Sequence, residues 1–146
     1  MTGRLLSSLL ALAFLGASVP APGLATDEEV AARQVALEVA GAFQNDGFKL
    51  RDGFWSGRLE KGATKVIQVN LFAGNEYWFV LGAVAPAKKV LISVFDESGQ
   101  PVECEPYEGD ASSAAGFSPG VSGPYYVKVT LLDGDPAAFC MLYSYK

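Results

Sequence analysis

The stretch that decides the fold is residues 65–84, KVIQVNLFAGNEYWFVLGAV. In its first half isoleucine, valine and leucine alternate with polar residues, which is the period of a half-exposed strand. Residues 73–75, Ala-Gly-Asn, are typical of a tight turn, and residues 76–84 are then apolar on both faces. The stretch therefore predicts a surface strand that turns into a central, buried strand.

The same pattern extends over residues 47–146, where short apolar runs alternate with Gly, Asn, Asp, Ser and Pro. Seven or eight short strands with no helix between them favour one antiparallel β-sandwich domain. Residues 106–124 are expected to be rich in loops. The predicted strands are residues 55–59, 65–72, 76–84, 90–96, 100–105, 125–132 and 138–145, with a further short strand around 114–117.

Residues 26–46 predict one amphipathic helix ahead of the strands. Thr26 followed by Glu29 is a capping-box pattern, and Gly47 can end the helix in a left-handed conformation. The helix is expected to pack on the sandwich, although it could instead face a partner or be flexible. Its expected apolar face consists of Ala32, Val35, Ala36, Val39 and Phe43.

Residues 1–25 have the pattern of a secretory signal peptide. Arg4 is followed by an apolar run over residues 5–19 and by small residues at 23 and 25. The run is too short to span a bilayer comfortably, which takes about 20 residues. We therefore expect three segments, a signal peptide (1–25), the helix (26–46) and the sandwich (47–146). The mature chain is expected in the periplasm or outside the cell, with no membrane span.

The charge and the cysteine content of the chain limit the classes of partner and the kinds of site that it can have. Without Arg4 the chain has 10 basic and 16 acidic residues, and such acidity disfavours nucleic acid and anionic lipid. Cys104 and Cys140 predict one disulfide in an oxidising compartment, with two buried free thiols as the alternative. A metal site at these cysteines is disfavoured, because the chain has no histidine and no CxxC spacing.

The sequence contains two possible catalytic patterns, and neither favours an enzyme. Residues 116–120 match the GxSxG pattern of a hydrolase, but a chain without histidine cannot form a Ser-His-Asp triad. Glu103 and Glu105 could face one side of a strand as an acid–base pair, and a solvated strand face is the favoured interpretation. We therefore expect no enzyme and no cofactor. Calcium remains possible at the acidic turns 96–97, 108–110 and 133–135, although turns favour Asp and Gly for backbone reasons alone.

The candidate binding surface rests on aromatic residues. Most aromatic side chains of a small sandwich belong to its core, and Trp55 and Tyr107 are the two that we expect to be exposed for binding.

Four segments in order resemble the bacterial pre-peptidase C-terminal domain. They are Trp55–Gly62 with its GxLxxG pattern, Val69–Phe79 with LxAG and an aromatic strand, Val94–Gly99 with DxxG, and Ser122–Val129 with GxYxVxV. The resemblance covers residues 55–146 and implies a jelly-roll-like sandwich of the kind attached to secreted hydrolases, some of which bind calcium or polymeric substrates. Residues 63–66, Ala-Thr-Lys-Val, depart from the family's pattern of an Asp followed by an aromatic residue.

The leading functional hypothesis is an exported, non-catalytic β-sandwich module that binds or scaffolds a protein or polysaccharide. The alternative is a small acidic inhibitor of an extracellular or periplasmic enzyme. In that case a loop such as 105–124 would enter a basic active-site cleft, with Glu105, Glu108 and Asp110 steering association.

Overall fold

The computed structural model describes residues 25–146, so the predicted signal peptide lies outside the described residues except for Ala25. The elements in chain order are α1 (Asp27–Gln44), β1 (Lys49–Leu50), β2 (Trp55–Leu59), β3 (Thr64–Leu71), β4 (Tyr77–Ala83), β5 (Ala87–Phe95), β6 (Glu105–Gly109), β7 (Ser112–Phe117), β8 (Gly123–Gly134) and β9 (Ala137–Tyr145).

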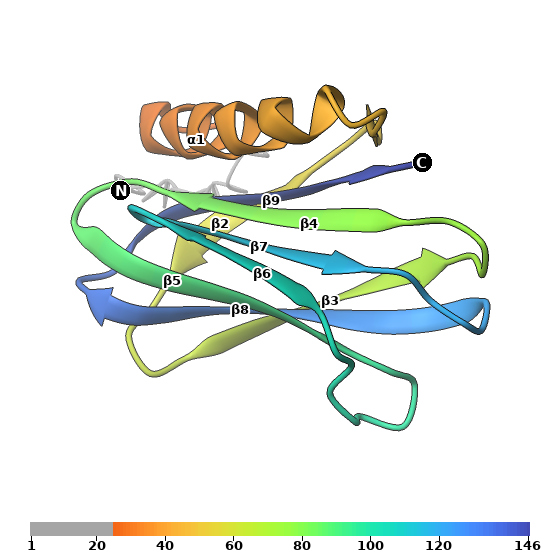
Figure 1. Ribbon diagram of the computed structural model, residues 1–146. Coiled ribbons are helices and arrows are strands. Elements are labelled where there is room, and N and C mark those ends of the chain that lie inside the picture. Colours follow the sequence, from red (N-terminus) through yellow and green to blue (C-terminus); the bar gives the residue numbers. More distant parts are fainter. Residues whose placement is uncertain (1–24) are drawn as a thin grey trace, which may run out of the picture.

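The strands form two antiparallel sheets packed face to face (Figure 1). The larger sheet has the order β1-β9-β4-β7-β6, and β2 also pairs with β9. The smaller sheet has the order β3-β8-β5. Central β4 lies between β9 and β7 and is almost entirely buried, as its unbroken apolar run predicts. The predicted fold class, an antiparallel β-sandwich preceded by one helix, is confirmed.

The main core fills the space between the two sheets. Large side chains of β4 such as Phe79 and Leu81 belong to the same core cluster as Val127 and Val129 of β8, and all four are fully buried. Burying a side chain of this size stabilises a fold by about 1.5–3 kcal/mol. The sheets are also joined by a hydrogen bond, because the Ile92 N–H donates to the buried Ser113 Oγ at 3.2 Å.

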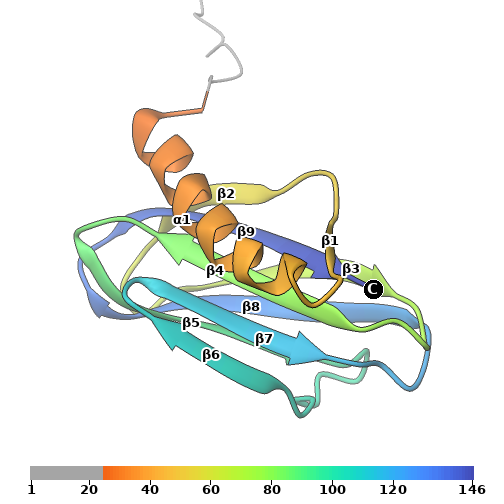
Figure 2. The ribbon, with the colours of Figure 1, turned by 45° about the horizontal axis from the view of Figure 1, so that its top comes forward.

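Helix α1 covers the outer face of the larger sheet, lying over β4 and β9 (Figures 1 and 2). Thr26 caps it as predicted, with the Glu29 N–H donating to Thr26 Oγ1 at 3.1 Å. The helix rests on three buried alanines, Ala32, Ala36 and Ala40. A Cβ on Gly82 of β4 would lie 2.5 Å from the Ala36 backbone nitrogen, so small residues on both sides allow this close approach.

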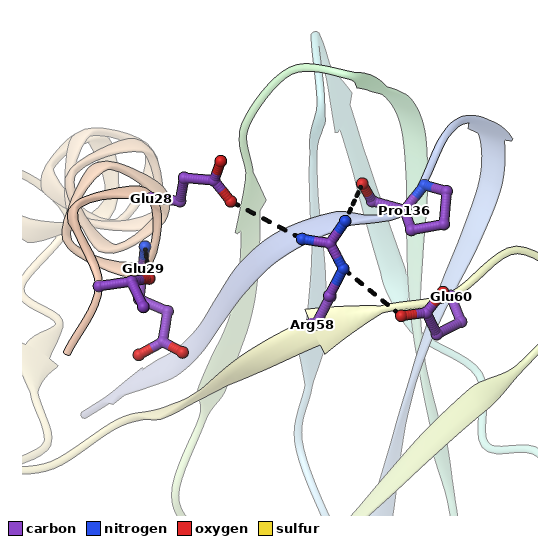
Figure 3. A network of polar contacts seen from close by, with 6 residues as sticks. Glu28, Glu29, Arg58, Glu60 and Pro136 are labelled. Atoms are coloured by element: carbon purple, nitrogen blue, oxygen red, sulfur yellow. Dashed lines mark hydrogen bonds and ion pairs between the residues drawn. The ribbon is translucent and has the colours of Figure 1, made fainter. Parts of the chain in front are cut away.

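Arg58 ties the first turn of the helix to the sheet (Figure 3). Its guanidinium lies 3.7 Å from Glu28 of α1 and 3.5 Å from Glu60, and it donates to the Pro136 carbonyl oxygen at 3.1 Å. The Arg58 side chain is 56% exposed, so these ion pairs orient the helix more than they stabilise it.

Two predictions about the middle of the chain are wrong. Residues 100–104 form no strand beyond a single bridge at Pro101, and the segment predicted to be rich in loops contains the β6–β7 hairpin. Exposed and polar residues dominate β6, whose burial pattern is that of a sheet edge, so it carries little apolar periodicity. The hairpin tip is held against the body, since the Ala83 N–H donates to the Ala111 carbonyl oxygen at 2.8 Å.

The predicted disulfide is also wrong, because Cys104 and Cys140 are free thiols. Cys140 lies on the helix-covered face of the larger sheet, whereas Cys104 packs against the core between the sheets. Side chains that point to opposite faces of a sheet cannot meet the geometry of a disulfide. Burial raises the pKa of each thiol to about 11, and for Cys140 the charge of Arg33 partly opposes this effect.

Within residues 25–146 the single helix does not combine the length and hydropathy that a bilayer crossing requires.

Candidate functional site

The candidate site is a groove on the helix-covered side of the larger sheet, where α1 ends and the sheet continues toward β6. We call it the α1–β6 groove; Figure 2 shows β7 and β6 extending beyond the helix. It has a volume of about 760 Å³. It is lined by Phe43, Asp46, Phe48, Glu76, Tyr77, Trp78, Glu105, Pro106, Tyr107, Gly116, Phe117, Ser118 and Lys146.

Two stacked aromatic rings form the floor of the groove. Phe43 in the last turn of α1 lies on Trp78 of β4 with ring centroids 4.1 Å apart and planes 8° apart. Gly116 sits opposite Trp78 on β7, and a Cβ there would approach the indole ring to 2.9 Å. The absence of a side chain at Gly116 thus lets the indole lie flat across β7, which is what the glycine of the GxSxG pattern does in this fold.

Strand β6 forms one wall, and its pleat determines which side chains face the groove. Glu105 pairs with Gly116 and Tyr107 pairs with Ala114, which places both on the helix side of the sheet. Tyr107 is 41% exposed and also contributes to a smaller hollow beside Phe43 and Glu38 of α1. The wall therefore presents one aromatic ring next to carboxylates.

The opposite wall is made by the end of α1 and the start of β4. Asp46 follows the helix and Glu76 precedes β4, and both line the groove together with Glu105 of the other wall. The last turn of α1 contains no basic residue, and the helix C-terminus adds the negative end of its dipole. Carboxylates, a helix C-terminus and aromatic faces all attract cations.

One cation of the chain already lies in the groove. The Lys146 Nζ is 3.1 Å from Glu76 Oε2, donates to the Asp46 carbonyl oxygen at 3.2 Å and lies 4.6 Å from the centroid of the Phe48 ring. Backbone hydrogen bonds between Lys146 and Glu76 hold the two residues side by side. The groove is therefore chemically suited to an ammonium group.

The two aromatic residues predicted to bind are not brought together. Tyr107 lines the α1–β6 groove, whereas Trp55 lies on β2, at the opposite edge of the larger sheet. Trp55 packs against the inter-sheet core, stacks on Tyr143 with centroids 6.2 Å apart and is covered by Arg51. The two side chains do not form one surface.

The acidic residues proposed for steering are likewise separated. Glu105 faces the groove, and Glu108 pairs with Ser113, whose hydroxyl points between the sheets. Asp110 lies in the turn at the far end of the hairpin. Most of the segment 105–124, which was predicted to be an inhibitory loop, forms the β6–β7 hairpin. Its strand β6 is a wall of the groove and not a loop that could enter a cleft.

Two of the three predicted calcium turns, 96–97 and 133–135, use a carboxylate for hydrogen bonds within the turn. Asp96 Oδ1 accepts hydrogen bonds from the Ser98 hydroxyl and from the Ser98 and Gln100 N–H groups, and these bonds hold the pKa of Asp96 below its usual value. Asp133 Oδ1 accepts from the Gly134 N–H at 2.8 Å. Across residues 25–146 no three acidic or cysteine side chains gather in a way that would hold a metal.

Sequence reasoning missed most of the groove. Phe43 was expected only as part of the apolar face of the helix, and Gly116 and Lys146 had no predicted binding role. A usable signal was the acidic and aromatic composition of residues 103–108, Glu-Cys-Glu-Pro-Tyr-Glu. That signal does not reveal the partners contributed by α1, β4 and the end of β9, since these come together only through the fold.

Comparisons with known proteins do not assign the chain to a family. No family model matches the chain, and no curated protein matches it, so the resemblance to the pre-peptidase C-terminal domain stays a prediction. Among solved structures, PliG of Aeromonas hydrophila, a periplasmic inhibitor of g-type lysozyme, matches with a TM-score of 0.49 and 17% sequence identity. The match covers 64% of this chain and 85% of that chain.

Proposed function

We propose that this chain is an exported, non-catalytic module that binds a basic segment of a protein partner in the α1–β6 groove. The observation that carries the proposal is that three acidic residues and a stacked aromatic pair line one cavity of about 760 Å³. Export rests on the signal-peptide pattern of residues 1–25.

Lysine and arginine side chains suit such a groove for two reasons. Their apolar stems can lie along Phe43 and Tyr107, while their charged ends reach Glu105, Glu76 or the end of α1. A cation over an aromatic face contributes about 0.5–1 kcal/mol at an exposed site. The net negative charge of the mature chain would further speed encounter with a basic partner.

A protein partner is favoured over a polysaccharide. Sugar binding relies on open aromatic faces, and Phe43 already covers a face of Trp78. The three acidic residues that line the groove match cationic groups rather than neutral hydroxyls. The inhibitor hypothesis is the case in which the basic segment belongs to an extracellular or periplasmic enzyme and the bound module blocks its active site.

The first experiment titrates the mature protein with hexalysine and follows the two tryptophan indole N–H signals by NMR. Trp78 lies in the groove and Trp55 lies at the far edge of the sheet, so Trp55 is an internal reference. We expect the Trp78 signal to shift and the Trp55 signal to stay. Glu105→Gln and Tyr107→Ala should each weaken binding by about two- to tenfold, since each removes one contact of about 0.5–1.5 kcal/mol.

The matched control is Asp135→Asn, which removes the same charge as Glu105→Gln. Asp135 lies in the β8–β9 turn, at the end of the sandwich opposite the C-terminus of α1 (Figure 1). Equal weakening by Asp135→Asn and Glu105→Gln would mean that hexalysine senses only the overall charge and would contradict the groove. The inhibitor form is tested by activity assays on a panel of secreted hydrolases, including a g-type lysozyme. Loss of inhibition in Glu105→Gln but not in Asp135→Asn is the expected result.

A further inference from the structure

Lys146 occupies one well-defined position in the α1–β6 groove. Its ammonium contacts a carboxylate oxygen of Glu76, the carbonyl oxygen of Asp46 and the face of the Phe48 ring. These three contacts come from two segments of the chain, the start of β4 and the turn after α1. An ammonium has three N–H donors, and here two oxygens and the face of one aromatic ring lie within reach of it.

The contacts hold Lys146 only weakly. The Lys146 side chain is 40% exposed and that of Glu76 is 52% exposed, and an ion pair at such exposure adds little to stability. If Lys146 swings into solvent, both charged groups remain hydrated, and no buried polar group loses its partner. Another ammonium group can therefore replace that of Lys146 at this position with only a small loss of stabilising free energy.

We propose that this position is the binding position for a lysine side chain of the partner, and that Lys146 is its internal competitor. The proposal rests on the proposed function, because it assigns one side chain of the basic segment to one place in the groove. Lysine fits better than arginine, since the acceptors are a single carboxylate oxygen, a single carbonyl and a ring rather than a carboxylate aligned for a bidentate fork. In the complex the partner's ammonium replaces that of Lys146, which turns out to solvent.

The test compares hexalysine binding to the wild type, Lys146→Met and Lys49→Met, again through the Trp78 indole signal. Lys146→Met removes the competitor and keeps a long apolar side chain. Lys49 lies on β1 directly opposite Tyr145 and does not line the groove, so Lys49→Met removes an equal charge outside it. We expect Lys146→Met to bind hexalysine about two- to fivefold more tightly than Lys49→Met, the range set by the strength of an exposed ion pair.

A second variant tests the position itself. Phe48→Leu keeps the site apolar and removes the ring below the ammonium, and in the Lys146→Met background it should weaken hexalysine binding by about two- to fivefold. Lys146→Met should raise the affinity for hexaarginine less than it raises the affinity for hexalysine.

The outcomes separate the two proposals. If the wild type binds hexalysine through the groove and Lys146→Met gains no more than Lys49→Met, the exchange position is wrong and the proposed function stands. An equal gain for hexaarginine would overturn the preference for lysine. If hexalysine leaves the Trp78 signal unchanged in all variants, both the proposed function and the exchange position are wrong.

Discussion

Phe43 and Trp78 stack with ring centroids 4.1 Å apart and planes 8° apart, so that a helical residue and a strand residue together make the floor of the groove. The same contact fastens the C-terminal end of α1 to β4. Fold and candidate site thus depend on one pair of rings, and changes that loosen the helix should also alter the groove.

Replacing Phe43 by alanine should destabilise the protein by about 1.5–3 kcal/mol, because the change removes a stacked, half-buried ring and exposes a face of the Trp78 indole to solvent. Urea denaturation followed by circular dichroism measures the loss. Val30→Ala is the control, since Val30 lies on the same helix and is 48% exposed. Similar losses in the two variants would show that the stacked pair has no special part in holding the helix.

Two glycine substitutions should act in opposite directions. Gly82→Ala should destabilise strongly, by about 2 kcal/mol or more, because its Cβ would lie 2.5 Å from the Ala36 backbone nitrogen and would push the helix off the sheet. Gly41→Ala should stabilise by about 0.5–1 kcal/mol, because Gly41 lies within α1 and an added Cβ meets nothing within 4 Å. Thermal melts of both variants check the signs, and a neutral Gly82→Ala would contradict the close helix approach.

The unreduced protein should contain two free thiols and no disulfide. In denaturant, a thiol reagent should therefore titrate two groups per molecule without added reductant. In the native protein both should react slowly, because burial raises the pKa of Cys104 and Cys140 to about 11 and little thiolate is present near neutral pH. Finding no reactive thiols in the denatured, unreduced protein would show that the two cysteines form a disulfide after all.

Stability should decline in alkaline solution. The thiol pKa rises from 9.0 in the unfolded chain to about 11 in the folded one, so the unfolded state loses its protons first as the pH rises. The contribution is complete below pH 9 and is lost between about pH 9 and 11, by up to about 2–3 kcal/mol for Cys140. Burial also raises the pKa of Tyr143, which acts in the same direction. Urea midpoints at several pH values should fall more steeply for the wild type than for Cys140→Ala.

Local sequence patterns were sufficient to predict those elements whose own residues carry a clear helix or strand period. The Thr26 cap and the alanine spacing predict α1, and the alternation after Lys65 predicts β3 almost to the residue. Strand β6 escaped prediction because an edge strand of exposed residues buries no alternate face, so the hydrophobic period is missing. The disulfide prediction failed for a related reason, since composition does not show which face of a sheet each cysteine side chain lies on.

The sequence by itself determined an antiparallel sandwich with a leading helix, because strand periodicity, turn residues and helix caps are local properties. The tertiary structure alone decided that α1 ends above Trp78, that β6 brings Glu105 and Tyr107 to its side, and that Lys146 meets Glu76. These residues are far apart along the chain and share no local pattern. Their meeting follows from strand order and from the close approach at Gly82, which are consequences of packing the whole core.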